Sequence, residues 1–353
     1  MTSLEGTATN LVGDRRLAEC DVLQGMQHFP SLAVLSFRGS THWTRVGRAL
    51  KLRRYTVLKG IGHPHLSRVY LEVLFLLQAI RYDLAQAWVE SLPKEHVWLS
   101  DFDRSAYCRP LIWQAKKLAR TTATMVHGTP NQNYLPPVAE NVLVWGEAQL
   151  QWFRAVNQDC TLHVVGRPDI CKFIAPGPPK RLRVVHSMES LMETEKEALA
   201  RLCSMARSWG LDVSLRLHPS VTRSDLDENW KTAAAALAFE NKSENFLASL
   251  APGDVVVGIN STAIIDALII GVPAWTLADA MRELPCDLSK LRDASGPLLV
   301  VLSQPEQGAA VRLAGPDMLR YSRSLGLGPA LVAATGAESE ELLRRAVGNM
   351  LRD

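Results

Sequence analysis

Short apolar runs alternate with amphipathic helical patterns along most of the chain. In the first half, the runs that predict strands lie at 31–37, 54–60, 96–100, 121–126, 141–146 and 161–166. Helical patterns lie between them, over about 43–51, 66–90 and 107–120, with Pro110 expected to break the last one early. Because parallel strands need a crossover segment between them, this alternation predicts an α/β fold with a parallel sheet.

The pattern restarts after a proline-rich interruption. The stretch APGPPK (175–180) cannot form regular structure, because proline lacks a backbone donor and fixes its own φ angle. Strands are predicted after it at 181–187, 212–220, 254–260 and 272–277, and helices at 193–210, 244–250, 261–271 and 338–353. We therefore expect two Rossmann-like domains with parallel sheets facing across a cleft. Their predicted limits are an N-terminal domain over 1–168, a linker over 169–182, a C-terminal domain over 183–336 and a terminal helix over 337–353.

Length and charge agree with two soluble domains. A chain of 353 residues is too long for one small core, and its 47% hydrophobic and 21% charged content is ordinary for a globular protein. The net charge of +3 does not indicate nucleic-acid binding. A mild basic bias is compatible with anionic substrates, or with peripheral contact at the inner face of a cell membrane.

Cysteine usage and apolar segments favour a cytoplasmic protein. The six cysteines form no Cys-x-x-Cys pair and no Cys/His cluster with metal-ligand spacing, so we expect neither a disulfide framework nor a metal site. The first residues lack the apolar core of a signal peptide. The most apolar stretch, 69–80, is too short to span a bilayer and contains Glu72, which favours a buried helix.

Candidate ligand-binding residues gather after the strand VVVGIN in the second half. Open parallel sheets bind ligands beyond the carboxyl ends of their strands. Asn260, Ser261 and Thr262 open a helix at such an end, where free N–H groups and the helix dipole suit a phosphate. Asp266 follows one turn later on an otherwise apolar helix, and a ribose diol would serve as its partner. The alternative is a plainly capped helix with a solvated Asp266.

The strand SLRLHPS supplies a second group of candidates. By chain order it is the neighbouring strand, which would place His218 near Ser261, with Pro219 holding the imidazole in place. His218 could donate a hydrogen bond to a phosphate of the leaving nucleotide, and Arg216 would point to the cleft or to solvent. Ser187, after the first strand of this half, could belong to a donor-phosphate loop. A structural turn is the alternative for His218.

In the first half, the stretch MVHGTP is built the same way. His127 ends a strand, and a histidine is suited to take a proton from an acceptor hydroxyl near neutral pH. Asp101 and Asp103, past another strand end, could be the base instead or could orient His127. A loop histidine and helix-capping aspartates are the alternatives. The letters DFD also match Asp-x-Asp, but no metal is required where a helix N-terminus and His218 offset the phosphate charge.

The motifs VHGTP, VLVWGE, VVGRPD, RLHPS and INSTAIIDALIIGVP, in that order over 126–273, resemble bacterial GT-B transferases of surface polysaccharide synthesis. CDP-glycerol glycerophosphotransferases match at His127, their presumed base, and at His218, which serves the donor phosphates. CMP-sugar-dependent sialyltransferases and Kdo transferases match at His218-Pro219 and Ser261-Thr262. Those enzymes often use an acidic base, to which Asp101 or Asp103 would correspond.

The sequence departs from each pattern. Asn-Ser-Thr stands where glycerophosphotransferases usually have paired serines, and the acidic pair before a glycine of some sialyltransferases is missing. UDP-sugar 2-epimerases share the fold and a His-Pro motif, but their Asp-Ser-Gly-Gly loop is absent. The resemblance implies a metal-independent glycosyltransferase, without a cofactor, that moves a sugar from a nucleotide donor to a glycan or glycolipid acceptor of the capsule or lipopolysaccharide type. CMP-Kdo or CMP-sialate is the favoured donor. CDP-glycerol-type transfer, a UDP-sugar donor and a non-catalytic glycan-binding module remain alternatives.

Overall fold

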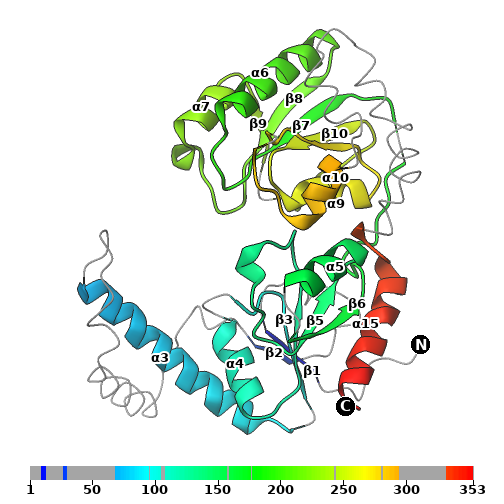
Figure 1. The fold of residues 1–353 in the computed structure, drawn as a ribbon. Helices are drawn as coiled ribbons and strands as arrows, with labels where there is room; N and C mark the ends of the chain where they lie inside the picture. Colours follow the sequence, from blue (N-terminus) through cyan, green and yellow to red (C-terminus); the bar gives the residue numbers. More distant parts are fainter. Residues whose placement is uncertain are drawn as a thin grey trace.

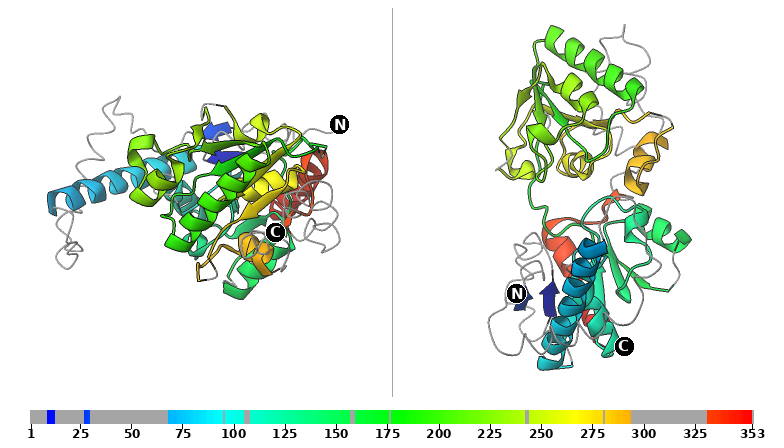
Figure 2. Two further views of the ribbon diagram at one scale, coloured as in Figure 1. Left: turned by 90° about the horizontal axis from the view of Figure 1, so that it is seen from above. Right: turned by 90° about the vertical axis from the view of Figure 1, so that its left-hand side faces the viewer.

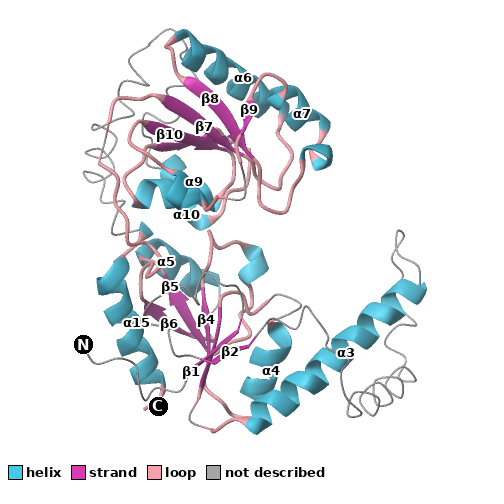
Figure 3. Ribbon diagram, turned by 180° about the vertical axis from the view of Figure 1, so that it is seen from behind, coloured by secondary structure: helices cyan, strands magenta, loops and turns pink. Residues whose placement is uncertain are grey.

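The protein forms two lobes stacked one above the other, each built on a parallel sheet (Figure 1). The computed structural model describes residues 9–12, 27–29, 68–94, 96–104, 108–156, 159–175, 177–241, 244–279, 281–293 and 331–352. The strands predicted at 31–37 and 54–60 and the helix predicted at 43–51 lie outside the described residues. The α/β class with two parallel sheets is confirmed. Figure 3 distinguishes the helices from the strands of each lobe by colour.

The first sheet has the strand order β2-β1-β3-β4-β5-β6, and its paired strands are all parallel. Its elements are β1 (Thr9–Val12), β2 (Gln27–Phe29), α3 (Arg68–Ser91), β3 (Val97–Ser100), α4 (Arg109–Lys117), β4 (Thr122–Met125), β5 (Asn141–Val144), α5 (Glu147–Val156) and β6 (Thr161–Val164). The strands β1 and β2 were not predicted, because three or four residues are too few to show a clear pattern. Pro110 lies in the first turn of α4, so it begins this helix and does not break it. Backbone N–H groups in the first turn have no partner within the helix, so the N–H group that proline lacks is not missed there.

The second sheet has the order β11-β10-β7-β8-β9, again parallel throughout. Its elements are β7 (Arg181–Val185), α6 (Glu193–Ser208), β8 (Asp212–Arg216), α7 (Glu228–Ala234), β9 (Ala238–Phe239), α8 (Phe246–Ser249), β10 (Asp254–Gly258), α9 (Thr262–Ile269), β11 (Ala274–Thr276) and α10 (Cys286–Asp293). The strand β7 begins at Arg181, inside the last two residues of the predicted linker.

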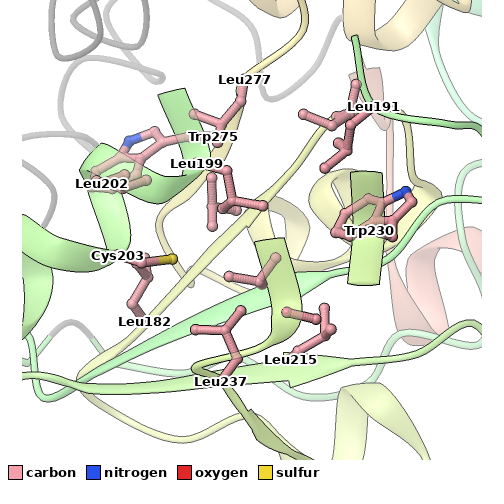
Figure 4. Close-up of a cluster of buried hydrophobic side chains, with 14 of the residues drawn as sticks. Leu182, Leu191, Leu199, Leu202, Cys203, Leu215, Trp230, Leu237, Trp275 and Leu277 are labelled. Atoms are coloured by element: carbon pink, nitrogen blue, oxygen red, sulfur yellow. The ribbon is translucent and has the colours of Figure 1, made fainter. Parts of the chain in front are cut away.

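Apolar side chains cover both faces of the second sheet. One face packs against α6 and α7, where Leu199, Leu202 and Trp230 meet strand residues such as Leu182 and Leu215 (Figure 4). The other face packs against α9 and α10. Two buried faces explain why these strands have nearly continuous apolar runs in the sequence.

The last helix, α15 (Gly336–Met350), returns to the first lobe. Leu343, Val347 and Met350 are buried in one cluster with Val97 and Leu99 of β3. The right-hand view of Figure 2 shows this red helix within the first lobe. The terminal helix is therefore part of the first lobe's core. Among the described helices, none is both long and apolar enough to cross a membrane.

The strand order changes the expected arrangement of the candidate residues. The strand β7 lies between β10 and β8, so His218 is not next to Ser261 as chain order suggested. Neighbouring strands lie about 4.8 Å apart, which puts the ends of β8 and β10 on the order of 10 Å from each other. The loop after β7, residues 186–190, occupies the position between them.

Candidate functional site

His127 lies just past the end of β4 with an exposed side chain. Its Nδ1 atom is 2.9 Å from the backbone carbonyl oxygen of Asp101. A carbonyl oxygen can only accept, so Nδ1 carries the proton and donates it. The neutral ring therefore keeps its lone pair on Nε2, which is the atom that a general base needs.

Two aromatic residues fix the plane of this imidazole. The ring of Phe102 packs edge-on against it at 5.3 Å between centroids, and the Tyr134 hydroxyl lies 3.2 Å from Nδ1. Burial raises the pKa of Tyr134 well above its ordinary value, so the hydroxyl stays protonated. Sequence reasoning missed Tyr134, which follows His127 by seven residues and has no motif of its own.

The two aspartates have different tasks. The Asp101 main-chain carbonyl oxygen accepts the hydrogen bond from His127 Nδ1, which is the kind of contact expected of a residue that orients His127. The Asp103 carboxylate accepts the backbone N–H groups of Val138 and Ala139 at 2.6 and 2.7 Å. Its side chain is buried, and this burial raises its pKa although the two N–H groups oppose the rise. Asp103 thus ties down a loop, a geometry that argues against its role as the base. Neither aspartate caps α4, whose N-cap is Cys108.

The stretch after His127 meets the start of α9 in the second lobe. The Thr129 backbone N–H donates to Thr262 Oγ1 at 3.3 Å. A Cβ atom on Gly128 would lie 2.9 Å from the same oxygen, so only glycine permits this approach. The Thr262 hydroxyl keeps its own proton and can still donate to a ligand. The two predicted motifs are therefore brought together across the lobes.

The start of α9 has the predicted cap. Ser261 is the N-cap, and its Oγ accepts the Ala263 backbone N–H at 3.3 Å. The preceding Asn260 donates from Nδ2 to Glu189 Oε1 at 2.6 Å. The loop after β7 is thus joined to the end of β10 by a side-chain hydrogen bond.

His218 is exposed, and its tautomer is opposite to that of His127. The Ser220 backbone N–H points at His218 Nδ1 from 3.3 Å, and Ser220 Oγ is 2.7 Å away. An amide N–H can only donate, so Nδ1 is an acceptor and the neutral ring carries its proton on Nε2. In this tautomer, Nε2 of His218 can act as a hydrogen-bond donor. Pro219 is exposed within the same turn, which closes through the Val221 N–H and the His218 carbonyl at 2.9 Å.

Arg216 and Ser187 do not have the geometry predicted for ligand binding. The Arg216 guanidinium is buried and donates to the carbonyl oxygens of Asn241 and Glu244 beneath α8. Burial lowers its pKa, against the opposing effect of Glu240. Ser187 is also buried, and its Oγ turns back to the Glu189 carbonyl at 3.5 Å. Alternation along β8 sends Arg216 to the face covered by α8, and neither to a cleft nor to solvent.

Asp266 has a protein partner where a ribose diol was expected. Arg167, just past the end of β6, donates from Nη1 to Asp266 Oδ1 at 2.7 Å and also pairs with Asp169. Its guanidinium stacks on Trp145 at 4.2 Å. Burial alone would lower the pKa of Arg167, but Asp266 and Asp169 raise it above the ordinary value. The pair joins the two lobes, so Asp266 is better explained as an interlobe contact.

A third interlobe contact was not predicted at all. Asp287, in the first turn of α10, is fully buried and accepts from Gln149 Nε2 of α5 at 2.8 Å. Burial raises the pKa of Asp287 to about 6. The next residue back, Cys286, donates its backbone N–H to the Pro130 carbonyl at 3.4 Å. No signal in the sequence pairs positions so far apart in the chain.

His186 is a further histidine at the same sheet edge. It is buried and packs on the Trp230 ring at 4.7 Å between centroids, and its Nδ1 has no hydrogen-bond partner among the residues that the structure describes. Burial, with a smaller contribution from the nearby His218, lowers the pKa of His186 to about 4. The imidazole is therefore neutral over the physiological range. In the part of the chain that the structure describes, no group of three or more His, Cys, Asp or Glu side chains is placed to hold a metal ion.

The two-sheet α/β fold is shared with solved structures of UDP-GlcNAc 2-epimerases. No protein-family profile matches the sequence, and no curated protein matches it significantly. The S. aureus MnaA–UDP co-structure is similar with a TM-score of 0.55 and 9% identity, over 98% of this chain and 97% of that one. The Neisseria meningitidis UDP-GlcNAc 2-epimerase bound to UDP-GlcNAc is similar with a TM-score of 0.50 and 10% identity. The match covers 98% of this chain and 100% of that one.

The pneumococcal O-GlcNAc transferase GtfA in complex with UDP and GlcNAc gives a TM-score of 0.46 and 12% identity. The match covers 78% of this chain and 60% of that one, so the chain spans about three fifths of GtfA.

Proposed function

We propose that the protein is a GT-B glycosyltransferase that moves a sugar from a nucleotide donor to a glycan or glycolipid acceptor. The observation that carries the proposal is the opposite orientation of the two exposed histidines. The neutral His127 ring carries its lone pair on Nε2 at the end of β4, while the neutral His218 ring carries its proton on Nε2 at the end of β8. One ring is prepared to accept a proton and the other to donate a hydrogen bond.

In this proposal the carboxyl edge of the second sheet binds the donor. The Thr262 hydroxyl and the capped start of α9 would hold phosphate oxygens, and His218 would stabilise the negative charge that develops on the leaving nucleotide. The acceptor hydroxyl would give its proton to His127 Nε2 as its oxygen attacks the anomeric carbon and the bond to phosphate breaks. Asp101 and Tyr134 would hold the base in place.

Two considerations bear on the donor. The sequence motifs favour CMP-sugars, whereas the similar structures are named with UDP or UDP-GlcNAc. Both are pyrimidine nucleotides, so the proposal is a pyrimidine-nucleotide sugar, and polyol-phosphate transfer from CDP-glycerol remains an alternative.

The test is a donor panel of UDP-GlcNAc, UDP-glucose, CMP-sialate, CMP-Kdo and CDP-glycerol, each incubated with the protein and a mixture of glycan acceptors. We expect release of UDP or CMP from one sugar donor, and release that is lost in the His127→Gln variant. Release from CDP-glycerol alone would favour the polyol-phosphate alternative. Conversion of UDP-GlcNAc into an isomer without nucleotide release would overturn the transferase proposal in favour of epimerisation.

A further inference from the structure

The amide of Asn260 has only one orientation that agrees with its neighbour. Its Nδ2 atom lies 2.6 Å from Glu189 Oε1. An ionised carboxylate can only accept, so the contacting atom must be the NH₂ group and not the carbonyl oxygen. The Asn260 side chain is half-buried, and no donor among the described residues contacts its Oδ1 atom. At the edge assigned to the donor, Asn260 therefore presents a hydrogen-bond acceptor.

Arg282 holds Glu189 in this position. Its Nη1 donates to Glu189 Oε2 at 2.6 Å, and its Nη2 donates to the Ser190 carbonyl at 2.8 Å. The remaining donors bind Glu195, which is buried and also accepts the backbone N–H groups of Met192 and Asp279. The guanidinium thus connects the loops that follow β7 and β11. Glu189, held by Arg282, in turn fixes the Asn260 side chain through its hydrogen bond.

The acceptor atom Oδ1 of Asn260 disfavours a phosphate group as its binding partner. Phosphate oxygens of a nucleotide carry no proton near neutral pH, so the Asn260 carbonyl would face them as one acceptor against another. Hydroxyl groups of a sugar ring do carry a proton. Asn260 immediately precedes Ser261 and Thr262, the residues that the proposed function assigns to phosphate.

We propose that Asn260 determines specificity by accepting a hydrogen bond from a sugar hydroxyl of the bound nucleotide or nucleotide sugar, with Glu189 and Arg282 as positioning residues. This inference rests on the proposed function and replaces the phosphate role expected for Asn260. The hydroxyl belongs either to the ribose or to the transferred sugar, and the experiment separates these two sources.

The test compares dissociation constants by calorimetry for CMP against 2′-deoxy-CMP and 3′-deoxy-CMP, and for UDP against UDP-GlcNAc. In the wild type we expect the ligand that carries the recognised hydroxyl to bind about tenfold more tightly than its comparison ligand, as one hydrogen bond gives. Asn260→Ala should remove this preference and leave the affinity of the comparison ligand unchanged. A preference between ribonucleotide and deoxynucleotide assigns the ribose, and one confined to UDP-GlcNAc assigns the transferred sugar.

A side-chain exchange makes the test specific. Asn260→Asp alone puts two carboxylates together and should lose the preference. When Asn260→Asp is combined with Glu189→Gln, the introduced amide can donate to the introduced carboxylate, whose second oxygen remains an outward acceptor. We expect this double variant to restore the preference to within about threefold of the wild type. Asn229→Ala, which removes a hydrogen bond to the Leu191 carbonyl, is the structural control and should leave the preference intact.

The outcomes separate the two claims. Tight nucleotide binding with no change of preference in Asn260→Ala, or no recovery in the double variant, overturns the inference alone. Failure of the wild type to bind any of these nucleotides overturns the proposed function and this inference with it.

Discussion

The two exposed histidines show how a main-chain contact can assign a chemical role to a side chain. Each follows a strand, and nothing in the sequence says which nitrogen carries the proton. A carbonyl oxygen from the Asp101 loop fixes one ring, and an amide N–H from Ser220 fixes the other in the opposite state. The roles proposed for His127 and His218 thus depend on backbone geometry.

The first prediction concerns His127. His127→Gln removes the basic nitrogen while keeping a polar side chain, so we expect the turnover number to fall by a factor of about 10²–10⁴. Nucleotide affinity should be unchanged, because the proposed donor site lies on the other lobe. Steady-state kinetics with the donor found in the panel measures the turnover number, and calorimetry measures the nucleotide affinity. A variant with normal turnover would remove His127 from the mechanism.

The second prediction separates structure from ligand binding at Arg216. Arg216→Met removes a buried cation that satisfies two carbonyl oxygens, and we expect a loss of about 2 kcal/mol in the free energy of unfolding. Urea denaturation gives this value. The affinity for nucleotide should match that of the wild type under native conditions. A large loss of affinity in a stably folded Arg216→Met would restore the ligand role predicted from the sequence.

These residues show which parts of the candidate site could be predicted from the sequence. The positions of His127, His218, Ser261 and Thr262 at strand ends could be predicted, because apolar runs locate strands and capping residues locate helix starts. The roles of Arg216 and Asp266 could not, because both residues pair with groups brought close only by the tertiary fold. Periodicity says which residues are buried but not which partner a buried charge meets.

At the scale of elements, the order of strands decides which loops form the candidate site. Chain order suggested that the ends of β8 and β10 are neighbours, but β7 pairs with both. The loop of residues 186–190 therefore lies at the centre of the edge, where Glu189 contacts Asn260. Helix α10 is a similar case. It follows the second sheet in sequence but contacts α5 of the first lobe through Asp287.

The third prediction uses the buried carboxyl of Asp287. Its pKa of about 6 lies above the ordinary value of 3.8, so the folded state holds this proton more tightly than the unfolded chain. The resulting stabilisation is fully present below about pH 4 and is lost as pH rises through 6, a change on the order of 3 kcal/mol.

The variant Asp287→Asn cannot ionise. It should unfold at a higher temperature than the wild type at pH 7.5, and it should lack the contribution of this residue to the pH dependence between 4 and 6. Melting temperatures measured from pH 4 to 8 check both points. A variant that is less stable at pH 7.5 and shows the same pH dependence as the wild type would contradict the assignment.

For the whole molecule, three side-chain hydrogen bonds between the lobes join residues far apart in the chain. These are Thr129 to Thr262, Arg167 to Asp266 and Gln149 to Asp287, which join residues 133, 99 and 138 positions apart. The two-lobed α/β architecture could be predicted from the alternation of strands and helices. The contacts between lobes could not, because no local pattern encodes a pairing at that separation.

The fourth prediction tests the approach of the lobes at Gly128. Gly128→Ala places a methyl group 2.9 Å from Thr262 Oγ1, so we expect a destabilisation of about 1 kcal/mol and turnover reduced about tenfold. Thr262→Ala combined with Gly128→Ala removes the clash and should recover part of the stability, as a double-mutant cycle would show. Additive effects of the two substitutions would mean that these residues do not meet in solution.

The central claim is that the carboxyl edge of the second sheet binds the phosphate of a pyrimidine nucleotide through His218 and the start of α9. A crystal structure of the protein with the nucleotide released in the donor panel tests it most directly. The account predicts phosphate oxygens within hydrogen-bond distance of His218 Nε2 and of the Thr262 hydroxyl, with His127 on the opposite side of the nucleotide. A phosphate bound elsewhere, out of reach of both His218 and Thr262, would contradict it.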